Sequence, residues 1–246
     1  MNRVLTAALV IPLVLSVTYW APAWLFSLVV AAVATAALDE FFGLVDGWGL
    51  AGPPRWVIML GTAVTLSFYG GIGWTLGVIV GAFLLLMAVS LVHGKVETFG
   101  ERVMVGLSGI LYTCGLAGFL ILVPRLALLV LFGIIWFGDS AAYYCGRAFG
   151  RYRLAPKISP GKTVEGAIAG GVVGISVGVF LGHGLELLDL SYSWLLVVSI
   201  LTAVAGQVGD LAESAFKRSA QVKDSASLLP GHGGLLDRMD SLLFAA

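Results

Sequence analysis

Long apolar blocks follow one another along most of this sequence, and short polar segments separate them. Each block runs for roughly 17 to 25 residues, the length of helix that crosses the hydrocarbon core of a bilayer. The pattern predicts an all-α, polytopic integral membrane protein with about eight to nine transmembrane helices. The predicted helices cover residues 4–20, 23–44, 55–70, 73–92, 103–123, 126–145, 164–184 and 193–216, and a last apolar segment covers 235–246.

The composition agrees with a membrane location. Of the 246 residues, 59% are hydrophobic and only 11% are charged, unlike the composition of soluble domains. Arg3 before an apolar run also fits a secretory signal peptide, but the run continues through Trp20 and Trp24 without a small-x-small cleavage site. A first membrane span is therefore favoured. Cys114 and Cys145 fall in predicted spans, as is typical of small buried apolar residues.

The charges are balanced in number but not in placement. The formal net charge is zero, which gives no indication of a nucleic-acid partner. If the predicted spans alternate in direction, every Lys and Arg except Arg125 falls on one side of the membrane. Basic loops mark the cytoplasmic side. We therefore expect the N-terminus and the polar segments to face the cytoplasm of a bacterial-type inner membrane.

Five carboxylates lie inside or at the ends of predicted spans, where an ionised side chain is costly unless it faces a polar interior. All five lie toward the cytoplasmic ends and together predict a polar cavity open to that face: Asp39, Glu40, Asp139, Asp210 and Glu213. For Asp39 and Glu40, side chains that simply reach the interface are an equal alternative. For Asp139 and Asp210 a functional role is favoured. One face of the helix predicted over 193–216 collects polar groups at helical spacing: Gln207, Asp210, Ser214 and Lys217.

The loop between the sixth and seventh spans is strongly basic and contains Arg147, Arg151, Arg153, Lys157 and Lys162. This charge suits a polyanionic ligand or anionic head groups, although a basic loop that only sets topology is the alternative. In ISPGKTVEG, Ser159 is expected to cap a helix that begins at Pro160, with free amides and Lys162 forming a phosphate site. The stretch is not a P-loop, because Pro156 stands where that motif needs glycine.

The stretch KRSAQVKDSASLLPGHGGLLDRMD, from Lys217 to Asp240, concentrates polar chemistry near the end of the chain. Its basic residues suit phosphate groups and are Lys217, Arg218, Lys223 and Arg238. Its aspartates are hard oxygen ligands and are Asp224, Asp237 and Asp240. Asp237 and Asp240 would share one side of a helix opposite Asp210, a pattern that suits one or two Mg2+ ions. Gly233 and Gly234 allow a close ligand, and His232 is as consistent with a structural hydrogen bond as with proton transfer.

The segment from Ser214 to Ser241 resembles the signature of the phosphatidate cytidylyltransferases, also called CDP-diacylglycerol synthases. Its matching elements are Ser214, Lys217-Arg218, Lys223-Asp224, His232 to Gly234, Asp237-Arg238 and Asp240. Further similar patterns are Asp139 to Arg147, Ile158 to Gly166, and Gln207 with Gly209-Asp210. The resemblance covers about residues 135–246, and earlier only LDEFF around Glu40 is similar. Relatives usually continue through another apolar helix, whereas this sequence stops at Ala246.

The resemblance implies a reaction of CTP with phosphatidic acid that gives CDP-diacylglycerol and diphosphate, with Mg2+ as cofactor and the bilayer as environment. We accordingly divide the chain into N-terminal transmembrane helices, 1–125, and a C-terminal catalytic region, 126–246. The expected metal ligands are Asp210 and Asp237, completed by Asp240, Asp224 and Asp139. The expected phosphate-neutralising residues are Lys217, Arg218, Lys223 and Arg238, and the expected substrate contacts are Arg147, Ser159, Lys162, Ser214, His232, Gly233 and Gly234.

Several alternatives stay open at this point. A monovalent ion as the second metal and a homodimer as the assembly are both left open. An ion-coupled transporter would also bury carboxylates, but its site should lie near the membrane midplane rather than at one face. A CTP-dependent lipid kinase would share the metals and basic groups. A CDP-alcohol phosphotransferase would begin its motif with DGxxAR, which is absent here.

Overall fold

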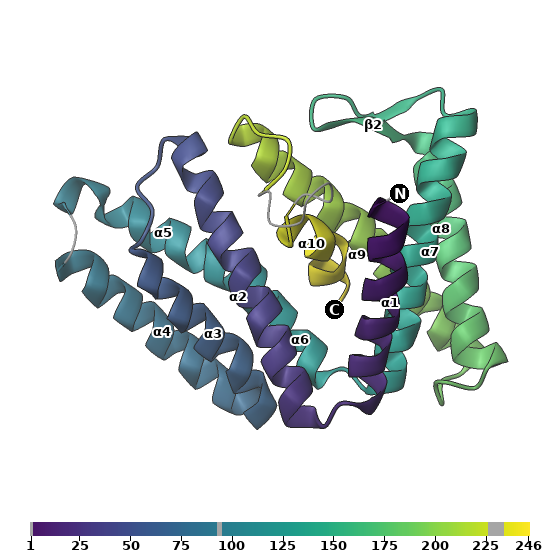
Figure 1. Cartoon of the computed structure of the whole chain (residues 1–246), viewed down its shortest axis with the longest axis horizontal. Coiled ribbons are helices and arrows are strands. Elements are labelled where there is room, and N and C mark those ends of the chain that lie inside the picture. The colour runs from purple at the N-terminus through teal and green to yellow at the C-terminus, as the bar shows by residue number, and fades with distance from the viewer. Residues whose placement is uncertain (1, 93–94, 226–233) are drawn as a thin grey trace. The chain divides into compact units, whose positions relative to one another are not determined.

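The computed structural model describes residues 2–92, 95–225 and 234–246. Helices make up nearly all of it (Figure 1). In the first half the long helices are α1 (Asn2–Trp20), α2 (Ala23–Trp48), α3 (Ile58–Ser67), α4 (Ile72–Val92), α5 (Phe99–Gly109) and α6 (Leu116–Leu122). Short 3-10 turns are η1 (Arg55–Val57), η2 (Phe68–Gly70) and η3 (Val96–Thr98), and the π-helical turn η4 (Ile110–Gly115) joins α5 to α6.

The second half contains four helices and one β-hairpin among the described residues. The helices are α7 (Arg125–Phe149), α8 (Val164–Val179), α9 (Tyr192–Ser219) and α10 (Leu236–Ala245), and the π-helical turn η5 (Phe180–Gly184) extends α8. Strands β1 (Arg153–Ala155) and β2 (Ser159–Thr163) pair antiparallel between α7 and α8. All eight predicted helical ranges thus coincide with helical segments.

Within the described residues, six helical segments are long and apolar enough to cross a membrane. They are Ala23–Trp48, Ile72–Val92, Val96–Leu122, Arg125–Phe149, Val164–Gly184 and Tyr192–Ser219. The apolar stretch Leu9–Trp20 in α1 is shorter. The prediction of an all-α, multi-pass membrane protein is confirmed, while the count of eight to nine spans stays a prediction.

The contacts divide the chain into two compact units. Unit 1 consists of Met1–Leu122 and Phe216–Met239, and unit 2 consists of Val123–Ala215 and Asp240–Ala246. Helix α9 therefore continues from unit 2 into unit 1, and α10 continues from unit 1 into unit 2. The residues that we expected in one C-terminal catalytic region are distributed over both units.

Unit 1 packs around α2. Helix α3 contacts both α2 and α4, and the fully buried side chain of Leu38 on α2 lies in this core. The end of α9 joins the same unit through aromatic side chains: Phe41 packs edge-on against Phe216, with ring centroids 5.5 Å apart. The indole N–H of Trp48 donates a hydrogen bond of 3.1 Å to the carbonyl of Phe216. The C-terminal segment is thereby held against the end of α2.

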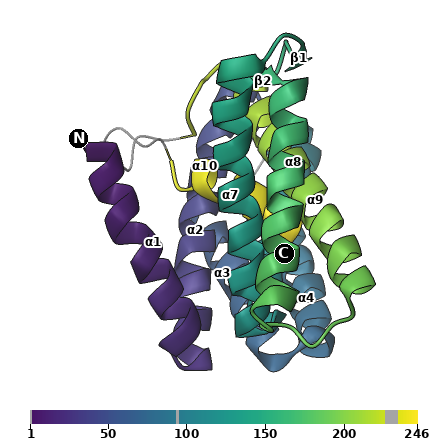
Figure 2. The same ribbon diagram turned by 90° about the vertical axis from the view of Figure 1, so that its right-hand side faces the viewer.

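Unit 2 is built on α7 and α8, which lie side by side along most of their length (Figure 2). Buried glycines of α8, which carry no side chain, allow this close approach. A Cβ atom built on Gly170 would lie 2.8 Å from the carbonyl oxygen of Gly138 on α7. The buried core of this unit includes Val130, Ile134 and Ala203.

The prediction that the helix after the basic loop begins at Pro160 is wrong. Ser159 and Pro160 belong to β2, and α8 begins four residues later at Val164. Thr163 is the residue that caps α8, because its hydroxyl oxygen accepts a hydrogen bond of 3.1 Å from the N–H of Gly166. Pairing with β1 satisfies the backbone of this segment, and a two-stranded hairpin tolerates proline at its edge. The expected phosphate cradle at Pro160 is therefore not formed by a helix start.

Candidate active site

Three carboxylates from three helices form one part of the candidate site, and all belong to unit 2. Asp139 lies on α7, Asp210 on α9 and Asp240 on α10. Asp139 and Asp240 each interact electrostatically with Asp210 and with Lys162, and Asp240 also interacts with Asp139. Because like charges repel, this arrangement favours a positive charge among the three carboxylates. These three residues are among the five metal ligands predicted from the sequence, whereas Asp237, one of the two first choices, belongs to unit 1.

Lys162 supplies positive charge to this carboxylate cluster. Its Nζ atom forms an ion pair with Oδ2 of Asp210, and the two side chains are 27% and 30% exposed. The hairpin that carries Lys162 is tied to the first turn of α8, because the carboxylate of Glu165 accepts a hydrogen bond of 3.2 Å from the backbone N–H of Tyr152. Lys162 was expected to meet a phosphate, and it reaches the site from β2 rather than from a helix.

Helix α10 approaches α9 closely enough to bring Asp240 beside Asp210. A Cβ atom built on Gly209 would lie 2.4 Å from the carbonyl oxygen of Asp240 and 3.0 Å from Cβ of Phe244. Only glycine leaves room for this contact. With ten residues, α10 is too short to cross a bilayer. Burial, and then the neighbouring Asp210 carboxylate, raise the pKa of Asp240 to about 7.

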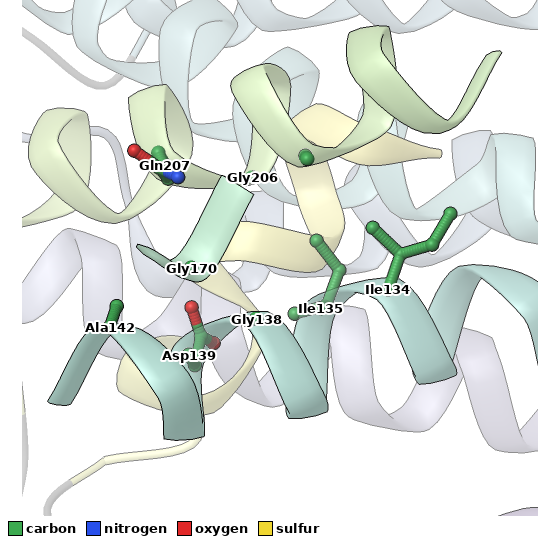
Figure 3. A pocket seen from close by; sticks show the side chains of 9 residues that line it. Ile134, Ile135, Gly138, Asp139, Ala142, Gly170, Gly206 and Gln207 are labelled. Carbon is green, nitrogen blue, oxygen red and sulfur yellow. The ribbon is translucent and has the colours of Figure 1, made fainter. Parts of the chain in front are cut away.

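A small pocket lies beside Asp139, among α7, α8 and α9. Figure 3 shows the Asp139 carboxylate and the Gln207 amide at this pocket. The lining residues are otherwise small or aliphatic: Ile134, Ile135, Gly138, Ala142, Gly170, Ala203 and Gly206. Gln207 is held in place because its amide donates a hydrogen bond of 3.0 Å to the carbonyl of Ala167. Gln207, one residue of the polar face predicted for α9, thus borders the pocket together with the carboxylate of Asp139.

A separate cluster of candidate residues belongs to unit 1 and centres on Asp237, in the first turn of α10. One carboxylate oxygen of Asp237 lies 2.5 Å from Nζ of Lys217, and the two side chains are only 11% and 14% exposed. The other oxygen accepts hydrogen bonds from the backbone N–H groups of Gly234 (2.7 Å) and Ser225 (3.2 Å). Asp237 therefore joins α9, the segment at Ser225 and the start of α10. Its expected role as a metal ligand stays a prediction.

Glu40 was a candidate for the polar cavity in the sequence, but its contacts in unit 1 were not predicted. Its side chain is buried, with 4% exposure, so the alternative in which it merely reaches the interface is wrong. Its carboxylate instead accepts hydrogen bonds from Ser225, Leu235 and Leu236. The neighbouring Asp39 is half-exposed and pairs with Arg55, which fits the interface alternative. The one signal in the sequence was a carboxylate inside the apolar stretch LDEFF.

The remaining predicted residues are distributed over exposed or partly buried positions. Arg147, Arg218, Lys223, Asp224 and Arg238 are exposed, and Ser159 and Ser214 are partly buried. A guanidinium nitrogen of Arg218 donates a hydrogen bond of 3.2 Å to the carbonyl of Val222. His232 and Gly233 lie outside the described residues. The roles expected for these residues, in substrate contact, phosphate neutralisation or metal binding, stay predictions.

The three carboxylates of unit 2 are not close enough together to form a metal site by themselves. Within 2–92, 95–225 and 234–246, no group of three or more His, Cys, Asp or Glu side chains lies close enough together to hold an ion. The cluster of Asp139, Asp210 and Asp240 nevertheless has the chemistry of a site for a hard cation, because its donors are carboxylate oxygens. It carries three acidic groups against the single ammonium of Lys162. The magnesium expected from the sequence stays a prediction, and the oxygen atoms of these three carboxyl groups are the type of donor that it would need.

Comparison with known proteins identifies the family. The model of the cytidylyltransferase family matches residues 1–246. The chain is 50% identical over 111 residues to the phosphatidate cytidylyltransferase of Bacillus subtilis, a match that covers 45% of this chain and 41% of the relative. It is 46% identical over 121 residues to the phosphatidate cytidylyltransferase of Haemophilus influenzae, over 48% of this chain and 42% of the relative.

These matches span less than half the length of each relative. The family model, in contrast, extends over all described elements, including the first-half helices in which the sequence showed little beyond hydrophobic character. The resemblance in the signature segment and the match over the whole chain agree with each other. The chain belongs to the cytidylyltransferase family.

Proposed function

We propose that the protein is a phosphatidate cytidylyltransferase, which converts CTP and phosphatidic acid into CDP-diacylglycerol and diphosphate. The observation that carries this proposal is the cluster of Asp139, Asp210 and Asp240 with Lys162, in a chain of the cytidylyltransferase family. The names of the bacterial relatives support the choice of substrates. The membrane-spanning helices support a lipid substrate that enters from the bilayer.

In the proposed reaction, a phosphate oxygen of phosphatidate attacks the α-phosphorus of CTP. A new P–O bond forms there, the bond between the α-phosphorus and the bridging oxygen breaks, and diphosphate leaves with the electron pair. Both reactants are anionic, so the main tasks of the protein are to position them and to neutralise their charge. A covalent intermediate on the protein is not needed for this transfer.

The basic residues have distinct tasks in this proposal. Lys162 is already held among the carboxylates by Asp210 and would meet a phosphate oxygen at that cluster. Lys217 is held by Asp237 in unit 1 and would neutralise charge on the nucleotide. The exposed residues Arg218 and Lys223 would bind the leaving diphosphate, for which a forked guanidinium is well suited.

Within unit 2, the residues that would hold Mg2+ are Asp139, Asp210 and Asp240. Asp237 belongs to unit 1, and its role as a metal ligand is the prediction from the sequence. These carboxylates would hold the ion through their oxygens, and the bound ion would supply positive charge to offset the charge of the transferred group. The carboxylates themselves orient their neighbours: Asp210 fixes Lys162, and Asp237 fixes Lys217. Replacement of either aspartate would release a lysine as well as remove an oxygen ligand.

We further propose that this site faces the cytoplasm. The orientation rests on the basic residues near the site, because cytoplasmic loops of membrane proteins are rich in Lys and Arg. The hairpin between α7 and α8 carries several of them, and Arg151, Arg153 and Lys157 are exposed there. CTP would then reach the site directly from the compartment that contains it.

The product of the reaction provides the test. The purified chain in detergent micelles is incubated with CTP, phosphatidate and Mg2+, and the lipids are examined by mass spectrometry. We expect a lipid whose mass has increased by one cytidylyl group, and we expect Asp210→Asn and Asp237→Asn to form it at least about 100-fold more slowly. Asp39→Asn is the control, since the Asp39 side chain is half-exposed and pairs with Arg55 rather than with a residue of either cluster. Absence of a cytidylyl lipid with the wild-type chain would refute the proposal.

A further inference from the structure

Glu40 occupies an unusual position for a glutamate in a membrane protein, because it is buried and surrounded by hydrogen-bond donors. It lies on α2, and its partners lie 185 to 196 residues later in the chain. Oε1 accepts a hydrogen bond of 2.7 Å from the N–H of Leu235, and Oε2 accepts one of 2.8 Å from the N–H of Leu236. Leu236 is the first residue of α10. Glu40 thus provides the start of α10 with an acceptor that the helix cannot provide for itself.

The hydroxyl of Ser225 is the third partner of Glu40. It lies 2.7 Å from Oε2 of Glu40 and 3.2 Å from Oδ2 of Asp237. A hydroxyl has one proton to donate, so the shorter contact assigns that proton to Glu40. Asp237 instead receives the backbone N–H of the same residue. Glu40 and Asp237 are thus connected through Ser225, and a change at Glu40 is transmitted to the carboxylate that binds Lys217.

Gly234 shows how closely these groups are packed. A Cβ atom built there would lie 2.1 Å from Oγ of Ser225 and 2.2 Å from Oε2 of Glu40. No side chain can occupy this space unless the hydrogen-bonded groups move apart. The N–H of Gly234 donates to Asp237, as described above. Gly234, which we predicted to contact substrate, therefore packs against Glu40 and Ser225 and donates its N–H to Asp237.

We propose that Glu40 is a positioning residue for cytidylyl transfer. By binding Ser225, Leu235 and Leu236, it fixes the start of α10 and through it the pair of Asp237 and Lys217. This inference rests on the proposed function, because the role of Asp237 and Lys217 in the reaction is part of that proposal. Glu40 acts through Asp237 and does not itself contact substrate.

A glutamine at this position would not fulfil the same role, although it has nearly the same shape. The carboxylate offers acceptors on both oxygens, and all three partners are donors. The amide of glutamine offers one acceptor oxygen and an NH2 group that only donates. The NH2 group of the glutamine would then face one of the three donor groups that now bind Glu40, and two donors cannot form a hydrogen bond with each other. Aspartate would keep the charge and both acceptor oxygens on a side chain that is one methylene shorter.

The test compares Glu40→Gln, Glu40→Asp and the matched control Asp39→Asn in the full purified chain. The first measurement is hydrogen–deuterium exchange of the peptide that contains residues 234–240, which reports the contact itself and needs no activity. The second is the rate of cytidylyl transfer as a function of Mg2+ concentration. Loss of folded protein lowers the maximal rate but leaves the half-saturating Mg2+ concentration unchanged, so this concentration separates positioning from simple instability.

We expect Glu40→Gln to speed amide exchange at Leu235 and Leu236 and to raise the half-saturating Mg2+ concentration about 10- to 100-fold, the effect of losing a group that orients a metal ligand. Glu40→Asp should recover part of this loss, and Asp39→Asn should match the wild type in both measurements. Faster exchange in Glu40→Gln with an unchanged Mg2+ dependence would overturn the positioning role while leaving the proposed function intact. A wild-type chain that transfers no cytidylyl group would overturn both.

Discussion

Gly209 offers a direct test of how α10 is placed against α9. The substitution Gly209→Ala adds a single methyl group, and no charge or hydrogen bond changes. In the structure this methyl carbon would lie 2.4 Å from the carbonyl oxygen of Asp240, whereas ordinary van der Waals contact begins at 3.4 Å. The neighbour is backbone and cannot rotate away. Helix α10 must therefore move by about 1 Å at Asp240, or the two helices must separate.

The expected effects follow from this displacement. Overpacking of this kind typically costs about 1 to 3 kcal/mol of folding free energy. A misplacement of about 1 Å in a catalytic group can lower turnover about 100-fold. We therefore expect Gly209→Ala to lower kcat by roughly that factor and to lower the midpoint of thermal unfolding in detergent. The assay is the initial rate of cytidylyl transfer at saturating CTP and Mg2+, per mole of folded protein.

Gly81→Ala is the matched control. Gly81 also lies inside a helix, α4, but a Cβ atom built there meets nothing within 4 Å. This variant should keep the turnover and the unfolding midpoint of the wild type. If Gly209→Ala behaves like Gly81→Ala in both measurements, the close contact between α9 and α10 does not place Asp240, and the reasoning is refuted.

Two further predictions concern the hairpin and the helix that follows it. Lys162→Met removes the cation paired with Asp210, so turnover should fall about 100-fold. Lys162→Arg keeps a cation and should retain part of the turnover. Equal rates for Lys162→Met and the wild type would contradict the role of this ion pair. Thr163→Val removes the cap of α8 at nearly constant shape and should destabilise the protein by about 1 kcal/mol, seen as a lower unfolding midpoint. An unchanged midpoint would show that the cap contributes nothing measurable.

Much of the fold was predictable because membrane insertion imposes a simple rule on the sequence. A span must be helical and apolar over its whole length, so hydrophobic blocks mark helices directly. The ends were less predictable: α2 continues to Trp48 rather than residue 44, and α7 continues to Phe149 rather than residue 145. Polar residues end a hydrophobic block without ending a helix, since the backbone hydrogen bonds continue beyond the apolar stretch.

The candidate site was predictable only where it depends on local spacing or on an unexpected charge. Asp139 and Asp210 were recognisable because acids are rare within apolar helices. The role of Glu40 was not, because its partners are nearly 200 residues away in sequence and no local pattern encodes that contact. Ser159 was misplaced for a related reason. A serine before a proline suits a helix start as well as a strand, and only pairing with β1 decides between them.

The central claim is that this chain transfers the cytidylyl group of CTP to a lipid phosphate. The most direct measurement uses CTP labelled with 32P at either the α- or the γ-phosphate, with phosphatidate and Mg2+ and the purified protein. We predict that label from the α-position appears in the lipid fraction, that label from the γ-position leaves as diphosphate, and that Asp210→Asn suppresses both. Lipid labelled from the γ-position alone would identify a kinase and contradict the account, as would the absence of any labelled lipid.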